Sequence, residues 1–265
     1  MAKTIPDTKA AETAPDLPGR LLLRARDLTL RVPYYQPSAR DLLTRPSQLI
    51  SRAYTGGSNR RVKTILDGVS LDLHAGDRIG IIGINGSGKS SLLRMLARVY
   101  HPDSGTLDIN GSVTGLFTIT LGMNQEGTGL ENIYLRGLQM GLTMSEVRER
   151  VMPVIEFAQI DDAIDRPINT YSTGMLLRLA FAISTMITPD ILILDEWIGS
   201  GDAKFRAKAD KRMRDMVGQT RGLILASHNT SLLQDLCNIG LVLDGGMVAY
   251  SGPLDDAVHF YDTEL

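Results

Sequence analysis

The sequence is poor in cysteine, in long apolar runs and in charge of one sign. Cys237 is its single cysteine, so no internal disulfide can form, and we expect a buried apolar role for it in a reducing compartment. Lys and Arg total 28 against 30 for Asp and Glu, a balance that argues against a nucleic-acid partner. No apolar run reaches the roughly 18 residues of a transmembrane helix.

Residues 1–20 lack the apolar core of a signal peptide and are dominated by Ala, Pro, Thr and Asp. Such a composition is typical of a flexible N-terminal tail. Over the whole chain of 265 residues, 43% are hydrophobic and 22% are charged, as in an ordinary soluble globular protein. The length suits one large domain with a subdomain, or two small domains.

Short apolar segments alternate with helix-like segments along the chain. The pattern predicts strands at 21–32, 65–76, 77–84, 189–197, 222–229 and 239–246, short strands within 106–121 and a hairpin return from 247. Helical periodicity begins at 87, and a second helical region runs from about 128 to 188. The alternation predicts an α/β fold with a mostly parallel sheet, into which a helical subdomain of about 126–188 is inserted.

Residues 33–62 interrupt this pattern with several prolines, glycines and arginines. We expect them to form an irregular surface excursion between the first two strands, with a short helix within 38–54. An excursion of about thirty residues in a compact domain is usually functional.

The clearest motif is the octapeptide GINGSGKS at 83–90, which matches the phosphate-binding pattern G-x-x-x-x-G-K-[ST] between a predicted strand and a predicted helix. Its glycines allow several backbone N–H groups to converge on phosphate oxygens. Lys89 is expected to neutralise the outer phosphates, and the Ser90 hydroxyl to ligate Mg²⁺. The loop residues that we assign to nucleotide binding are Gly83, Asn85, Gly86, Ser87, Gly88, Lys89, Ser90 and Ser91.

The segment ILILDE at 191–196 supplies a second part of such a site. Its four apolar residues place the strand in the core, and two acids emerge at its end. Asp195 is expected to hold Mg²⁺ through water, and Glu196 to polarise the attacking water. The two motifs predict a protein that uses ATP and Mg²⁺, but they do not choose among kinases, GTPases and motors.

The segment YSTGM at 171–175 distinguishes among these classes. The chain here resembles the ATP-binding cassette family, whose signature motif is a short polar tract with glycine that opens a helix ahead of the aspartate strand. The residues that would fill this role, in place of the commoner Leu-Ser-Gly-Gly-Gln, are Ser172, Thr173, Gly174 and Met175. Because the chain's own P-loop already holds its phosphates, this second anion site at a helix N-terminus needs another protomer's ATP. The resemblance implies a head-to-tail dimer with two ATP molecules between P-loop and signature.

The resemblance also implies roles for two residues outside these motifs. His228, at the end of a predicted buried strand, matches the family's histidine that contacts the γ-phosphate and the attacking water. It therefore joins Glu196 and Lys89 as a catalytic residue. Asp202 falls in the loop that, in the family, crosses the dimer to the opposite nucleotide.

Two family positions are less well matched. The adenine-stacking aromatic is expected after the first strand, where Tyr34 and Tyr35 are the candidates and Tyr35 is the residue we assign. The family also has a glutamine near residue 120 that links Mg²⁺ to the membrane partner. Gln125 is the nearest glutamine, and it lies several residues late.

The segments TGLENIYLRGLQMGLTMSEV, YSTGMLLRLAFAIS and SHNTSLLQDLCN resemble the ATPase subunits of polysaccharide exporters, which handle O-antigen, capsule, galactan or teichoic acid. The resemblance spans 21–262 and implies a cassette domain with a P-loop core, an antiparallel β subdomain and the inserted helical subdomain. It implies a peripheral place on the cytoplasmic face of the inner membrane. The expected partners are a second copy of the chain and a multi-span permease that handles the polysaccharide, with the excursion near that permease.

Other classes stay open at this point. Some exporter ATPases carry a C-terminal carbohydrate-binding domain, which this chain is expected to lack. A cassette ATPase of another transporter is an alternative, as is a soluble one of DNA repair or translation. The DNA-repair class would need a long heptad insertion between the P-loop and the signature, and the sequence has none. The translation class would need a second P-loop, and the sequence has only one. A small-molecule P-loop kinase would leave the signature, His228 and Asp202 without a role.

Overall fold

The computed structural model describes residues 19–35, 60–117, 120, 122–197 and 203–265, with no side chain described for Tyr35, Arg60 and Ala203. Most of the expected tail and the centre of the excursion, including the short helix predicted within 38–54, lie outside these residues. Asp202 lies outside them as well.

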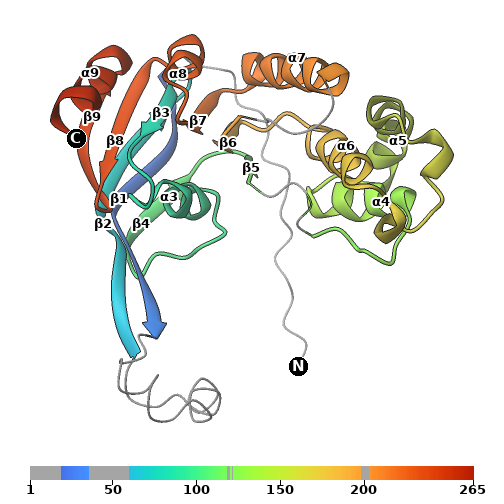
Figure 1. Cartoon of the computed structure of the whole chain (residues 1–265), viewed down its shortest axis with the longest axis horizontal. Helices are drawn as coiled ribbons and strands as arrows, with labels where there is room; N and C mark the ends of the chain where they lie inside the picture. The colour runs from blue at the N-terminus through green and yellow to red at the C-terminus, as the bar shows by residue number, and fades with distance from the viewer. Residues whose placement is uncertain (1–18, 36–59, 118–119, 121, 198–202) are drawn as a thin grey trace.

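The elements follow in the order that Figure 1 labels. They are β1 (Leu21–Tyr35), β2 (Arg60–His74), β3 (Arg78–Ile82), α3 (Lys89–Leu96), β4 (Ser104–Ile109), β5 (Val113–Leu116), α4 (Gly129–Gln139), α5 (Met144–Ala158), α6 (Thr173–Ser184), β6 (Ile191–Asp195), α7 (Ala203–Gln219), β7 (Gly222–Ala226), α8 (Thr230–Leu236), β8 (Ile239–Asp244), β9 (Met247–Pro253) and α9 (Leu254–Glu264). The sequence pattern does not single out α7, α8 and α9.

The main sheet has the strand order β5-β6-β7-β3-β8-β9, in which only β9 runs antiparallel, as a hairpin with β8. Its central strands are buried on both faces. In β6, Ile191 and Ile193 belong to the apolar cluster with α3, whereas Leu192 and Leu194 belong to the cluster with α7, α8 and α9. This two-sided burial explains the continuous apolar runs of the sequence. The predicted α/β fold with a mostly parallel sheet is confirmed.

A second, antiparallel sheet has the order β2-β1-β4 and packs against α3. Its two long strands leave the body of the protein as a ribbon (Figure 1). The expectation that 33–35 and 60–62 are irregular is wrong, because Pro33 pairs with Val62 and Tyr34 with Arg61. Proline is tolerated in β1 at this point because the strand pairs only with β2 there.

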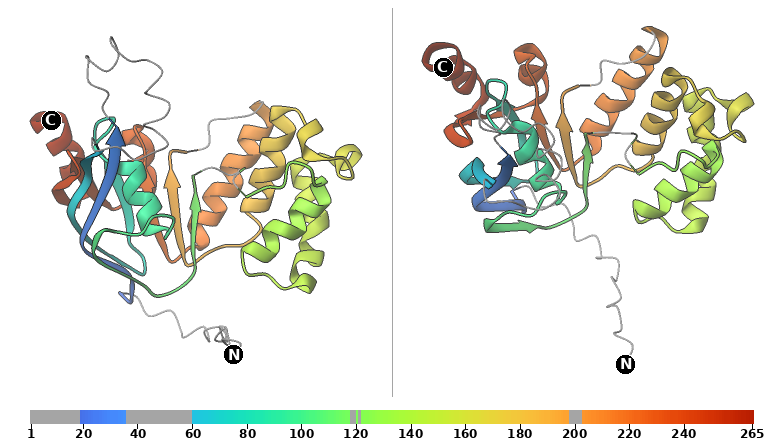
Figure 2. Two further views of the ribbon diagram at one scale, coloured as in Figure 1. Left: turned by 90° about the horizontal axis from the view of Figure 1, so that it is seen from below. Right: turned by 60° about the horizontal axis from the view of Figure 1, so that its bottom comes forward.

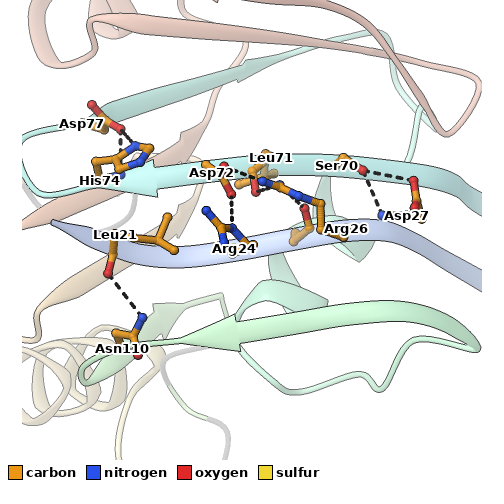
Figure 3. Close-up of polar contacts among 11 residues, drawn as sticks. Leu21, Arg24, Arg26, Asp27, Ser70, Leu71, Asp72, His74, Asp77 and Asn110 are labelled. Carbon is orange, nitrogen blue, oxygen red and sulfur yellow. Dashed lines mark hydrogen bonds and ion pairs between the residues drawn. The ribbon is translucent and has the colours of Figure 1, made fainter. Parts of the chain in front are cut away.

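Charged side chains form ion pairs between β1 and β2 (Figure 3). Arg24 and Arg26 on β1 both bind the Asp72 carboxylate on β2. The hydrogen bond from Arg26 is the main cause that lowers the pKa of Asp72 below its usual value. A shift in the register of β1 against β2 by one residue would turn the buried side chains of the shifted strand to solvent.

Helices α4, α5 and α6 form a block with an apolar core of its own, which includes Ile133, Val147 and Leu179. Thr128 and Thr143 begin α4 and α5 with capping boxes, each completed by the glutamate three residues later. The buried side chain of Asn132 joins α4 to the loop before it, since it accepts from Asn124 N and donates to the oxygens of Asn124 and Thr128. These bonds fix where the block begins.

Candidate active site

The loop between β3 and α3 needs glycine at its two ends. An added Cβ at Gly83 would lie 2.3 Å from Leu243 O, and Gly88 has a φ of 106°, a left-handed conformation that other residues rarely adopt. Gly88 is also the N-cap residue of α3, directly before its first residue, Lys89. The loop therefore wraps tightly against the sheet and directs the helix N-terminus, with its free N–H groups, toward the cavity.

The ammonium group of Lys89 lies inside this loop. Its Nζ donates to Gly83 O at 2.6 Å and to Ile84 O at 3.0 Å, and the residue is only 8% exposed. Burial lowers the pKa of Lys89, and the carboxylates of Glu196 and Asp195 act against that shift. A cation is thus held where the loop backbone would meet phosphate.

Ser87 adds a buried hydroxyl to the loop. Within the described part of the chain, its Oγ is shielded from solvent and has no hydrogen-bond partner. A buried hydroxyl without a partner costs free energy, of the order of 1–3 kcal/mol. Ser87 does not line the cavity described below, so the structure does not place this hydroxyl among the groups that would face a nucleotide.

The acidic end of β6 meets the end of β7. Glu196 has a φ of 74°, which is rare for a residue with a side chain, and its N–H donates to Ala226 O at 2.9 Å. Its carboxylate accepts from His228 N and from Ser227 Oγ, both at 3.1 Å. The His228 ring lies beside it, with Nε2 3.9 Å from Oε1. The structure therefore brings together the two residues to which the sequence assigns water activation.

One cavity of about 670 Å³ unites these parts. Its lining residues are Lys63, Ile65, Asn85, Gly86, Gly88, Lys89, Ser90, Ser91, Asp195, Glu196 and His228. The cavity thus joins the phosphate loop to both acids and to the histidine. The sequence analysis misses Lys63 and Ile65 of β2, and it misses Ser227, which donates to the Glu196 carboxylate.

The signature segment lies elsewhere on the chain and does not line this cavity. Ser172 begins α6, and its Oγ accepts from Met175 N at 3.2 Å. Ser172, Thr173 and Gly174 are exposed, and an added Cβ at Gly174 would meet no described atom nearer than Ser172 Oγ, at 4.0 Å. Nothing in the described fold requires glycine at this position.

The two other predicted contacts are not placed in the cavity. The side chain of Tyr35 is outside the described residues, and Tyr34 is 40% exposed and not a lining residue. Gln125 is exposed and does not line the cavity, so the structure brings it no closer to the nucleotide.

A second cavity, of about 470 Å³, lies between the end of α3 and α4. Arg94 and Arg136 line it, together with Val99, Tyr100 and Phe117, and no acid is among its described lining residues. The Nε of Arg136 is buried and has no hydrogen-bond partner in the described part of the chain. Two cations and an apolar wall thus face this cavity.

The parallel sheet carries a P-loop at 83–90, and Glu196 and His228 lie together at the ends of its strands. With the helical block and the polar start of α6, this arrangement defines an ATP-binding cassette ATPase. The chain belongs to the ABC transporter family, whose model matches residues 66–199. In the part of the chain that the structure describes, no helix is long and apolar enough to cross a membrane.

Curated relatives support this assignment. The chain is 37% identical over 225 residues to the O-antigen export system ATP-binding protein RfbE of Yersinia enterocolitica, which covers 84% of this chain and 94% of that protein. It is 40% identical over 189 residues to the O-antigen export protein RfbB of Myxococcus xanthus, covering 71% of this chain and 43% of that protein. It is 40% identical over 200 residues to the teichoic acids export protein TagH of Bacillus anthracis, covering 76% of this chain and 36% of that protein. The chain thus spans less than half of RfbB and of TagH.

Solved structures share the fold. An ATP-binding subunit of an ABC transporter aligns with a TM-score of 0.66 at 21% identity, over 89% of this chain and 91% of that one. A dimeric ATP-binding cassette with ADP and phosphate, in a post-hydrolysis state, aligns with a TM-score of 0.64 at 18% identity. The alignment covers 88% of this chain and 99% of that one. These structures confirm the predicted P-loop fold. The family model and the curated relatives confirm the predicted class, an ATP-hydrolysing transporter subunit.

Proposed function

We propose that this chain drives the export of a lipid-linked cell-surface polysaccharide of the O-antigen, capsule, galactan or teichoic-acid type. The likeness to RfbE, an O-antigen export ATP-binding protein that the chain matches over nearly its whole length, supports the substrate class. The cavity that joins the P-loop to Glu196 and His228 supports the reaction. The chain would act at the cytoplasmic face of the inner membrane.

Ser90 and Asp195 are the residues that would hold Mg²⁺. Both line the cavity, and a hydroxyl with a carboxylate is the kind of oxygen donor set that this ion prefers. When bound, the ion would neutralise charge on the transferred phosphoryl group. The residues present therefore fit a magnesium site.

Three side chains would carry out the proposed hydrolysis. Lys89 holds the outer phosphates by charge, from its place inside the loop. Glu196 orients the attacking water and takes its proton, because Ser227 and His228 fix the carboxylate in one direction. The His228 ring lies beside that carboxylate, where it would contact both the water and the γ-phosphate.

The second half of each site would come from another copy of the chain. The exposed start of α6 at Ser172 offers free N–H groups and a helix dipole, which favour an anion. The open space at Gly174 supports close approach by a large ligand from outside. We therefore propose a head-to-tail dimer in which each signature covers the ATP held by the opposite P-loop, with Asp202 crossing between the copies.

A membrane-spanning partner would carry the polysaccharide. The second cavity offers Arg94 and Arg136 beside an apolar wall, which suits a cytoplasmic segment with acidic and apolar side chains. The cavity lies between α3 of the core and α4 of the helical block. Closure of the dimer would therefore move this cavity. The excursion between β1 and β2 is a second candidate for contact with the membrane partner.

The test is purification of the tagged chain from membranes of its own cells in mild detergent. We expect a multi-span membrane protein to purify with it in a fixed ratio, and deletion of the gene to stop polysaccharide from reaching the cell surface. Arg136→Glu should weaken the association, and Arg148→Glu, an exposed arginine on α5, should not. A fully active enzyme without a membrane partner would contradict the proposal and favour a non-transport cassette ATPase.

A further inference from the structure

Helix α7 packs on the main sheet through buried apolar side chains, and it binds further elements on two other sides. At about 100° of rotation per residue, Phe205, Lys208 and Arg212 share one side of the helix. Asp210 and Arg214 lie on roughly the opposite side. Figure 2 shows α7 between β6 and the helical block in both views. The helix is thus placed to connect these two parts of the molecule.

The first side of α7 binds carbonyl groups at the ends of two helices of the block. Lys208 Nζ donates to Glu156 O at 3.3 Å and to Phe157 O at 3.1 Å, in the last turn of α5. Arg212 donates to Thr185 O at 2.8 Å, at the end of α6. These carbonyls have no partner within their own helices, so the two cations satisfy and cap both ends.

Aromatic packing reinforces the same side. Phe205 of α7 is 5% exposed and meets Phe157 of α5 and Phe181 of α6 edge to face, with ring centroids 5.8 and 5.9 Å apart. Such pairs stabilise by about 0.5–1.5 kcal/mol beyond the area they bury. Phe205 also belongs to the apolar cluster with β6 and β7, so the main sheet and the helical block together set the position of α7.

The opposite side of α7 holds the residue that follows the proposed catalytic acid. Trp197 Nε1 donates to Asp210 Oδ1 at 2.9 Å. Arg214 Nε donates to the other oxygen of Asp210 at 3.1 Å, and its guanidinium carbon lies 5.8 Å from the centre of the Trp197 ring. The indole is thereby bound to α7 by a hydrogen bond and by a cation–π contact.

Trp197 directly follows Glu196, whose left-handed φ of 74° costs free energy and persists only where the surroundings enforce it. The bond from Glu196 N to Ala226 O restrains one side of that residue. The fixed indole restrains the chain on its other side. Any shift of α7 would therefore rotate the backbone that carries the carboxylate.

We propose that Trp197 is a positioning residue for Glu196, and that it transmits the position of the helical block, through α7, to the catalytic carboxylate. The inference rests on the proposed role of Glu196. Nucleotide hydrolysis would then be favoured only when the block holds α7 in the position that aligns the carboxylate with the water.

The test is Asp210→Ala in the full-length chain. We expect kcat for ATP to fall roughly 10-fold, because misplacement of a catalytic group by about 1 Å can cost up to about 100-fold, while KM changes by less than about two-fold. Trp197 is the single tryptophan of the sequence, so intrinsic fluorescence reports on this indole alone. Its emission should shift to longer wavelength, and quenching by acrylamide should increase.

Three further variants control the test. Asp210→Asn keeps an oxygen facing the indole and should retain most of the turnover and the emission of the parent. Asp215→Ala removes the same charge from an exposed position of the same helix and should change neither. Trp197→Phe keeps an aromatic ring but loses the indole N–H, so its kcat should fall at constant KM. This variant also decides the question if Asp210→Ala does not fold.

A normal kcat in Asp210→Ala with a freed indole would overturn the positioning role. Unchanged fluorescence in that variant would also overturn it, because the indole would then not be held by Asp210. If Glu196→Gln abolishes turnover and Asp210→Ala does not impair it, only this inference fails. If Glu196→Gln leaves turnover intact, the proposed role of Glu196 fails instead.

Discussion

Replacement of Glu196 by glutamine is expected to stop ATP turnover while ATP stays bound. The amide keeps the size of the side chain. Its oxygen can accept from His228 N and its NH₂ group can donate to Ser227 Oγ, but it cannot take a proton from water. Loss of a general base lowers kcat by about 100-fold or more. ATP retained without hydrolysis should also favour a stable dimer. Phosphate release, bound-nucleotide analysis and size-exclusion chromatography measure these three results.

Glu149→Gln is the matched control for this variant, because Glu149 is exposed on α5 and far from the cavity lining. Its turnover should equal that of the parent chain. Near-normal hydrolysis by Glu196→Gln would show that the catalytic assignment is wrong.

Gly174→Glu is expected to reduce turnover by a factor on the order of 100, because a carboxylate would face the phosphates of the opposing ATP and like charges at close range cost several kcal/mol. The substitution fits the chain itself, since an added Cβ there meets open space. ATP binding to the chain's own P-loop should be unchanged, since Gly174 does not line that cavity. Equilibrium ATP binding and steady-state hydrolysis separate the two effects.

Gly218→Glu provides the comparison, since Gly218 is also an exposed helical glycine with no atom near its added Cβ. It adds the same charge to α7 and should leave turnover within about two-fold of the parent. Equal losses in both variants, or none in either, would contradict a role for the signature in the reaction.

The sequence predicts the phosphate side of the site well, for a physical reason. The P-loop is a continuous stretch of eight residues, so its glycines, lysine and serine lie close together in the fold because they are neighbours in the sequence. Glu196 and His228 are 32 residues apart, but they follow the neighbouring parallel strands β6 and β7. The carboxyl ends of such strands meet at one edge of the sheet, so buried apolar runs that end in polar residues predict their proximity.

Other features depend on packing that no local pattern encodes. Lys63 and Ile65 reach the cavity only because the antiparallel sheet folds over α3. The left-handed backbone of Glu196 and the attachment of Trp197 to Asp210 depend on contacts between separate elements. β1 extends past Pro33 because its neighbour on one side has ended, which the sequence of β1 alone does not show.

Serial dilution of the purified chain tests the central claim most directly, which is that two copies together form each reaction centre. Phosphate release per chain is measured at saturating MgATP, and light scattering gives the fraction of dimer at each concentration. We predict that turnover per chain falls in proportion to the dimer fraction and vanishes when only monomers are present. Full turnover per chain in strictly monomeric protein would contradict the account.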